Sequence, residues 1–284
     1  MRIIRSTKDM HKLSCNLRQR GRVIGFVPTM GALHAGHLSL IRQARRENNF
    51  VIVSIFVNPT QFAPHEDFNK YPRKLKIDSL LCKKEGVDVI FYPEVGEIYS
   101  KEHKTYVLVE GLSDVLCGKY RPGHFRGVAT VVAKLFNIIQ PDIAYFGQKD
   151  AQQAIIIQQM VRDLNIPIRI KVLPIIRESN GLALSSRNTY LTARQREAAV
   201  ALSEAAREAR IMVKQRVADS AKIIRAMRKI IQERKPARIQ YIEIVDLNEL
   251  KPVRLIKDKA LVALAVWIGK TRLIDNIILT PPRN

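Results

Sequence analysis

Apolar, strand-like runs alternate with amphipathic helical segments along the first 175 residues of the chain. The strand-like runs are Val23–Val27, Val51–Val57, Val87–Tyr92, Tyr106–Val109, Ile143–Phe146 and Ile168–Val172. The helical segments are Leu38–Asn48, Leu75–Gly86, Val128–Ile139 and Asp150–Asp163, with Gly111–Gly127 as a glycine-containing connection. A repeated strand-then-helix order is typical of parallel strands joined by helical crossovers. The order therefore predicts an α/β fold in which residues 1–175 form a doubly wound, Rossmann-like domain.

The pattern changes at about Ile176. A polar segment is followed by a capping box, in which Thr192 and Gln195 open an alanine-rich helix that extends to about Lys214. The remaining elements are a helix over Asp219–Arg234 and strands over Ile239–Val245, Ala260–Ile268 and Leu273–Leu279. Residues 176–284 are therefore predicted to form a smaller, lid-like α+β domain.

The stretch from Pro28 to His37 lies between the first strand-like run and the first helical segment. A helix start offers unpaired backbone N–H groups and a partial positive charge, which together favour an anion. The i, i+3 spacing of His34 and His37 stacks two imidazoles on the first turn, where they can hold a polyphosphate. Gly36, which has no Cβ, leaves room for a flat ring or a ribose. Zinc ligands and plain surface histidines are the alternative interpretations, and a zinc site needs a third ligand.

The net charge of +22 has two interpretations. It fits a nucleic-acid or membrane surface, or a basic surface on an enzyme whose substrates are anions. Lysine and arginine are scattered without a long block, which favours the enzyme and predicts no specific nucleic-acid partner. The three cysteines form no CxxC pair, and no apolar run is long enough to span a membrane. We therefore predict a cytoplasmic protein with no membrane association.

Several polar residues lie where they could complete a phosphate site, although the chain has no GxxxxGK[ST] loop and no GxGxxG fingerprint. Lys149 stands just before a predicted helix start, and Asp150 is a candidate cap of that helix. The hydroxyls and guanidinium of Ser185, Ser186 and Arg187 could close over phosphates as part of a lid. Gln61 and Gln153 could orient a hydroxy acid. Each residue alone also fits a solvated surface group or a linker.

Six blocks taken together resemble the pantoate–β-alanine ligase (pantothenate synthetase) family. They are Val27-Pro-Thr-Met-Gly-Ala-Leu-His-Ala-Gly-His37, Phe56-Val-Asn-Pro-Thr-Gln-Phe62, Tyr71-Pro-Arg73, Arg121-Pro-Gly-His-Phe125, Phe146-Gly-Gln-Lys-Asp-Ala-Gln-Gln153 and Leu184-Ser-Ser-Arg-Asn188. The HxGH element alone indicates only the wider group of nucleotidyltransferases and class I aminoacyl-tRNA synthetases, so a nucleotidyltransferase with another acceptor is a rival. Gln61 and Gln153 favour the ligase.

The resemblance implies a two-step reaction through pantoyl adenylate. ATP is the co-substrate, Mg²⁺ is bound mainly by ATP phosphates and water with no metal ligand assigned to the protein, and the enzyme is a homodimer. It implies catalytic roles for His34, His37, Lys149, Ser185, Ser186 and Arg187, with His37 as a proton donor. Pantoate would bind Gln61 and Gln153, and β-alanine would also meet Gln61. The residues implied in ATP binding are Met30, Gly31, Ala32, Leu33, His34, Ala35, Gly36, His37, Gly147, Gln148, Lys149, Asp150, Ile176, Leu184, Ser185, Ser186 and Arg187.

The chain departs from the family pattern after Tyr71-Pro-Arg73. Lys74 and Ile77 stand where the family often has a threonine and an acidic residue, and Asp78 follows. By the resemblance, Asp78 could order Mg²⁺ through water, and Lys74 could replace part of the cation's charge.

Overall fold

The structure is a computed structural model, and it describes residues 1–64 and 66–282. These residues form two compact units. The first unit contains Met1–Asp114, Gly118–Gly147 and Gln153–Pro174, and the second contains Val115–Cys117, Gln148–Gln152 and the chain from Ile175 onward. The division differs from the predicted boundary at 175/176 chiefly in the two short segments that join the second unit.

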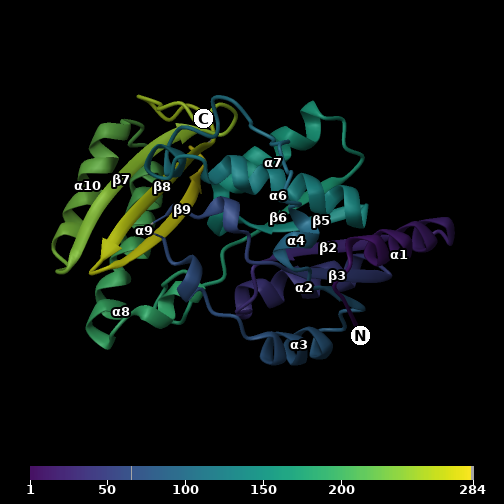
Figure 1. Ribbon diagram of the computed structural model, residues 1–284. Helices are drawn as coiled ribbons and strands as arrows, with labels where there is room; N and C mark the ends of the chain where they lie inside the picture. Colours follow the sequence, from purple (N-terminus) through teal and green to yellow (C-terminus); the bar gives the residue numbers. More distant parts are fainter. Residues whose placement is uncertain (65, 283–284) are drawn as a thin grey trace. The chain divides into compact units, whose positions relative to one another are not determined.

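The first unit is built on a six-stranded parallel sheet with the strand order β1-β4-β3-β2-β5-β6 (Figure 1). Its strands are β1 (Arg2–Ile4), β2 (Ile24–Thr29), β3 (Phe50–Ile55), β4 (Val89–Phe91), β5 (Ile143–Gly147) and β6 (Arg169–Leu173). The strand order reverses beside β2, which pairs with β3 on one side and β5 on the other. Ligands of such sheets bind at the carboxyl ends of the strands near this reversal. The predicted doubly wound α/β fold is confirmed.

Helices cover both faces of this sheet. The helices between β1 and β6 along the chain are α1 (Thr7–Gln19), α2 (Ala35–Glu47), α3 (Leu75–Lys84), α4 (Val95–Ile98), α5 (Cys117–Tyr120), α6 (His124–Ile139) and α7 (Ala151–Asp163). On one face, buried residues of α2 and α3 pack with alternate strand residues such as Val27, Val53 and Tyr145. On the other face, Phe26 meets Phe136 of α6 edge-on, with ring centroids 6.4 Å apart. Strand residues that point both ways are apolar, as a sheet buried on both faces requires.

The second unit contains an antiparallel sheet of β7 (Ala237–Asp246), β8 (Ala260–Ile268) and β9 (Thr271–Leu279). Helix α9 (Ala201–Lys214) packs against α10 (Ser220–Gln232), and both helices lie on this sheet (Figure 1). Alanines of α9 and the apolar residues Ile223, Met227 and Ile231 of α10 are buried there. The small alanine side chains allow the helix to lie close to the strands.

Four element predictions need correction. Residues 106–109 form no strand, because Val107 N–H donates to Thr130 Oγ1 of α6 (2.9 Å) instead of joining a ladder. The first strand and helix, β1 and α1, were not predicted, because β1 has only three residues and charged or polar residues separate the few apolar positions of α1. Helix α6 begins at His124, within the predicted connection. The predicted helix to Lys214 is divided at Val200 into α8 (Ala193–Ala199) and α9.

Among the described residues, no helix is both long and apolar enough to cross a lipid bilayer.

Candidate active site

The loop after β2 is fixed by two side chains. Thr29 Oγ1 donates to Ser54 O of β3 (2.8 Å) and accepts from Gly31 N–H (3.1 Å). Asp78 of α3 then receives the next two amides, Ala32 N–H at 2.9 Å and Leu33 N–H at 2.8 Å. Gly31 has a φ of +85°, and a Cβ there would meet Asp78 Oδ2 at 3.0 Å. The carboxylate of Asp78 therefore holds the loop that leads into the HxGH stretch.

Burial raises the pKa of Asp78, and the hydrogen bonds from Leu33 and Ala32 offset only part of that effect. Burial also raises the pKa of the nearby Cys82 thiol to about 12, with the Asp78 charge acting in the same direction. Burial is the largest cause of both pKa shifts.

His34 and His37 lie at the start of α2, as the sequence predicts. His34 is the N-cap residue, and its Nδ1 accepts from Gly36 N–H at 3.2 Å. His37 Nδ1 accepts from His34 N–H at 3.4 Å, which completes a capping box made of two imidazoles. The ring centroids are 4.1 Å apart with planes tilted by 39°. Because each Nδ1 is an acceptor, the proton of each neutral ring lies on Nε2.

Gly36 makes room for the first of these rings. A Cβ at this position would lie 2.9 Å from His34 Cε1 and 3.0 Å from His34 Nδ1. The sequence predicts that this glycine leaves room for a flat ring or a ribose. In the structure, the ring that lies against Gly36 is that of His34.

Gln61 lies at the end of a short 3₁₀ turn, η1 (Pro59–Gln61), beyond β3. Its Oε1 accepts from Asn58 Nδ2 at 3.1 Å, and its Nε2 contacts Met30 Sδ at 3.0 Å. The orientation of the Asn58 amide is fixed by backbone groups, since Thr60 N–H donates to Oδ1 and Gly127 O accepts from Nδ2. Asn58 therefore fixes which end of the Gln61 amide faces Met30. The buried Asn58 was not predicted as a site residue, although it lies in the block around Gln61.

The second unit carries the 3₁₀ turn η3 (Gln148–Asp150). Asn276 of β9 is 4% exposed, and its Nδ2 donates to Gln148 O (2.8 Å) and Lys149 O (2.9 Å). Lys149 Nζ lies 3.9 Å from Asp150 Oδ1. Asp150 ends this turn and α7 begins at the next residue. Asn276 was missed, although an Asp-Asn pair inside an apolar strand is a visible signal.

The Ser-Ser-Arg segment is also in the second unit. Leu184 N–H donates to Ile176 O (3.0 Å), and Ser185 caps the turn η4 (Ser186–Tyr190) by accepting from Arg187 N–H at 3.3 Å. The buried Asn188 donates to Ala183 O and to Glu178 Oε1, both at 3.0 Å. These hydrogen bonds hold the backbone of the turn that carries Ser185, Ser186 and Arg187.

Gly147 and Gln153 belong to the first unit. Gly147 ends β5 and is paired with Leu173 of β6, and a Cβ there would have open space around it. Gln153 lies on α7 and is partly exposed.

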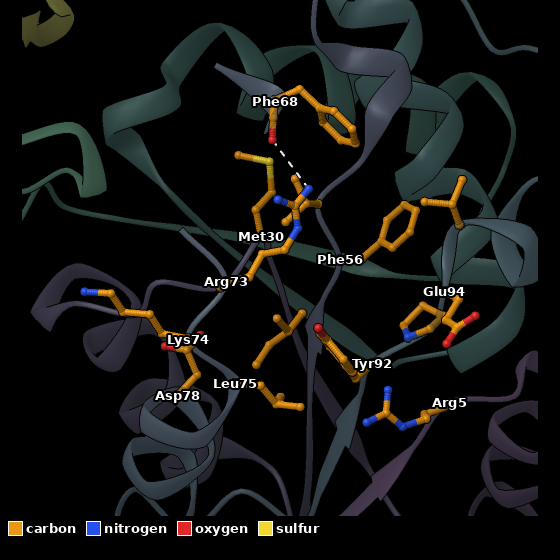
Figure 2. Close-up of a pocket in the computed structure, with 15 residues that line it drawn as sticks. Arg5, Met30, Phe56, Phe68, Arg73, Lys74, Leu75, Asp78, Tyr92 and Glu94 are labelled. Carbon is orange, nitrogen blue, oxygen red and sulfur yellow. Dashed lines mark hydrogen bonds between the residues drawn. The ribbon is translucent and has the colours of Figure 1, made fainter. Parts of the chain in front are cut away.

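A cavity of about 290 Å³ lies beyond the carboxyl ends of β2, β3 and β4 (Figure 2). Met30 and Gly31 line it, together with the cations Arg5, Arg73 and Lys74. Figure 2 shows Arg73 directed toward Phe68, whose carbonyl it contacts at 3.4 Å. Of the predicted site residues, only Met30 and Gly31 are among the lining residues.

No group of three or more His, Cys, Asp or Glu side chains in residues 1–64 and 66–282 is placed to hold a metal. Both oxygens of Asp78 receive backbone amides, and Ile77 beside it is apolar and exposed.

Comparisons with known proteins place the chain in one family. A model of the pantoate–beta-alanine ligase family matches residues 2–278. A pantothenate synthetase from Moorella thermoacetica is 54% identical over 279 residues, which cover 98% of this chain and 99% of the relative. The crystal structure of pantothenate synthetase from Thermus thermophilus superposes with a TM-score of 0.93 at 42% identity, covering 99% of this chain and 100% of that one.

A third relative was solved with ligands. Pantoate–beta-alanine ligase from Francisella tularensis, complexed with beta-gamma ATP and beta-alanine, has a TM-score of 0.79 at 39% identity over 98% of this chain and 97% of its own. Given matches of this extent, the chain belongs to the pantoate–beta-alanine ligase family.

Proposed function

We propose that this ligase joins pantoate to β-alanine in two steps, with the residues described above in named roles. In the first step, the pantoate carboxylate attacks the α-phosphate of ATP and pyrophosphate leaves. In the second step, the β-alanine amine attacks the carbonyl of pantoyl adenylate, which gives pantothenate and AMP. The observation that carries the proposal is the pair of stacked imidazoles capping α2, beyond the carboxyl end of a central parallel strand.

His34 and His37 act on the phosphates in the first step. Negative charge grows on the α-phosphate and on the departing pyrophosphate, and a preorganised donor aimed at such charge contributes about 3 kcal/mol. The Nε2–H of each ring is such a donor, because Nδ1 is already used by the backbone. Because a ring whose Nδ1 accepts a backbone N–H is neutral, His37 donates a hydrogen bond from Nε2–H to the leaving group and keeps its proton. The residues from Met30 to Gly36 contact the nucleotide, and Asp78 fixes their loop by accepting the N–H groups of Ala32 and Leu33.

Residues of the second unit complete nucleotide binding. Lys149 binds a phosphate as a point charge, and Asp150 accepts hydrogen bonds from the ribose. Ser185, Ser186 and Arg187 bind phosphate oxygens, while Gln148, Ile176 and Leu184 contact the nucleotide. Gly147, which belongs to the first unit, also contacts the nucleotide. The anchoring of the Gln148 and Lys149 carbonyls by Asn276 supports this role, because it fixes the backbone from which the lysine extends.

Gln61 and Gln153 bind pantoate, and Gln61 also meets β-alanine. The fixed amide of Gln61 supports this assignment, since its NH₂ group faces away from Asn58 and can donate to a hydroxyl or carboxylate. Mg²⁺ binds through the ATP phosphates and water, where it neutralises phosphate charge. Every role assigned to the protein's residues stands without a metal ligand from the chain.

Pantoate-dependent exchange of labelled pyrophosphate into ATP tests the first step, and pantothenate formation on adding β-alanine tests the second. Exchange without pantoate, or none with it, would contradict the proposed reaction.

Replacing His37 or Lys149 by alanine should slow exchange by about a hundredfold, the value of one oxyanion donor. His11→Ala on α1 and Lys222→Ala on α10 are matched controls, because both residues are exposed on other surfaces. A wild-type exchange rate in either site variant would remove that residue from the mechanism.

We also propose a homodimer in the cytoplasm. The three cysteines are free thiols, which fits a reducing compartment. Sedimentation equilibrium measures the oligomeric state, and a monomer across the micromolar range would contradict the dimer.

A further inference from the structure

The turn that carries Gln61 lies directly on helix α6. A Cβ on Gly127 of α6 would stand 2.3 Å from Thr60 O and 2.8 Å from Gln61 N. The glycine therefore permits backbone-to-backbone contact, and Asn58 Nδ2 reinforces it by donating to Gly127 O at 3.1 Å.

The carbonyl oxygen of Gln61 receives two side-chain donors from the start of α6. His124 Nδ1 lies at 2.7 Å and Arg121 Nη2 at 3.3 Å. A carbonyl only accepts, so Nδ1 of His124 carries the proton. Nε2 of the neutral ring then accepts from Arg121 Nη1 at 2.9 Å. The ring is thus fixed in one tautomer between Arg121 and Gln61.

Glu66 in turn holds Arg121. Its Oε1 accepts from Arg121 Nε at 2.6 Å and its Oε2 from Nη2 at 2.5 Å, a two-point ion pair. The Glu66 side chain is 24% exposed and the Arg121 side chain 14% exposed. Burial alone would raise the pKa of Glu66, but the hydrogen bonds and charge of Arg121 outweigh it and the pKa is lowered. The carboxylate therefore stays ionised and keeps the guanidinium in one orientation.

We propose that Glu66, Arg121 and His124 are positioning residues that fix Gln61 for pantoate. The inference rests on the proposed role of Gln61 and adds the groups that hold it. None of the three needs to touch substrate. With its carbonyl anchored, the turn cannot rotate, and the Gln61 amide meets pantoate without being ordered first. Release of the carbonyl should therefore weaken pantoate binding and leave ATP binding unchanged.

The test is Glu66→Gln, which keeps the side-chain shape and removes the charge that holds Arg121. We expect KM for pantoate in the exchange assay to rise about tenfold, with KM for ATP changed less than twofold. The matched control is Glu85→Gln, because Glu85 forms the same two-point pair with Arg42 between α2 and α3. Should Glu66→Gln fail to fold, Arg121→Lys keeps the charge and removes the planar fork, and the same selective rise is expected.

A double-mutant cycle separates positioning from a general structural effect. In a Gln61→Asn background, Glu66→Gln should change KM for pantoate less than twofold, because the group it positions is already altered. In a Gln153→Asn background, it should keep its tenfold effect.

An unchanged KM for pantoate in Glu66→Gln, or a full tenfold effect in the Gln61→Asn background, would overturn the inference alone. Absence of pantoate-dependent exchange in the wild type would overturn the proposed function, and the inference with it.

Discussion

His34 and His37 use the same ring nitrogen, Nδ1, to accept backbone N–H groups at the start of α2. The side chains proposed to act on phosphate therefore also cap helix α2. Such a pair is preorganised, because the hydrogen bonds that stabilise the helix end also fix the rings. A change that disturbs the rings should reduce activity more than stability.

Gly36→Ala tests this separation. The new Cβ would stand 2.9 Å from His34 Cε1, so the ring must turn away and lose its bond from Gly36 N–H. Alanine is the better helix former by about 1 kcal/mol, which offsets the lost cap. We expect exchange about tenfold slower with the thermal midpoint unchanged within 2 °C, measured by circular dichroism.

Gly96→Ala in α4 is the control for that variant, because a Cβ there meets nothing within 4 Å. Equal exchange rates in Gly36→Ala and the wild type would contradict the need for this ring position. The sequence predicts the stacked histidines from their spacing. It does not predict that the glycine makes room for His34, since that depends on a rotamer that only the folded loop defines.

Strands and helices of the first unit follow the sequence pattern closely, because a parallel sheet buries both faces and leaves near-continuous apolar runs. The pattern predicts a strand wrongly where a side chain, and not a neighbouring strand, accepts the backbone N–H. Residues 106–109 look like a strand, but Thr130 of α6 accepts the Val107 N–H. Arg2–Ile4 does join the sheet through β4, although three residues are too few for a periodic signal.

Helix α2 is tied to the sheet by Glu47. Tyr145 of β5 donates to its Oε2 at 2.6 Å, Gln43 to its Oε1 at 2.7 Å, and Lys171 of β6 forms an ion pair with it. The hydrogen bond from Lys171, followed by that from Tyr145, lowers the pKa of Glu47 from 4.5 to about 2. A lowered pKa means that this carboxylate stabilises the fold above about pH 4.5 and loses that contribution as the pH falls toward 2.

Glu47→Gln should therefore reduce the free energy of unfolding by about 1 to 2 kcal/mol at pH 7, after allowance for partial exposure. The deficit should shrink as the pH falls from 4.5 toward 2, where the wild-type carboxylate is protonated as well. Urea titrations at pH 7, 4 and 3 measure this. Glu85→Gln provides the comparison, and a deficit for Glu47→Gln that does not change with pH would contradict the assignment.

The division into two units places the predicted nucleotide residues on both of them. Lys149 belongs to the second unit with Asn276, while Gln153, four residues later, belongs to the first. Linear sequence marks the change of pattern near Ile176, but it does not reveal that residues 148–152 associate with β9. That association depends on the Asn276 amide, which reaches a segment more than 120 residues earlier in the chain. The fold class was therefore more predictable than the assignment of site residues to units.

The single tryptophan, Trp267 on β8, reports on unfolding of the second unit. In that unit, Arg177 forms a two-point ion pair with Asp275 (2.7 and 2.9 Å), and Asp275 is 3% exposed. Asp275→Asn keeps the shape of the side chain but leaves the Arg177 charge without its partner. The free energy of unfolding of this unit should therefore fall by about 2 kcal/mol. The loss is smaller than for a fully buried ion pair, because Arg177 is partly exposed. The fluorescence midpoint in urea should fall accordingly. The exposed Lys251–Glu249 pair supplies the control, since Glu249→Gln should leave the urea midpoint almost unchanged. Equal shifts in the two variants would mean that burial of Asp275 adds nothing to its ion pair.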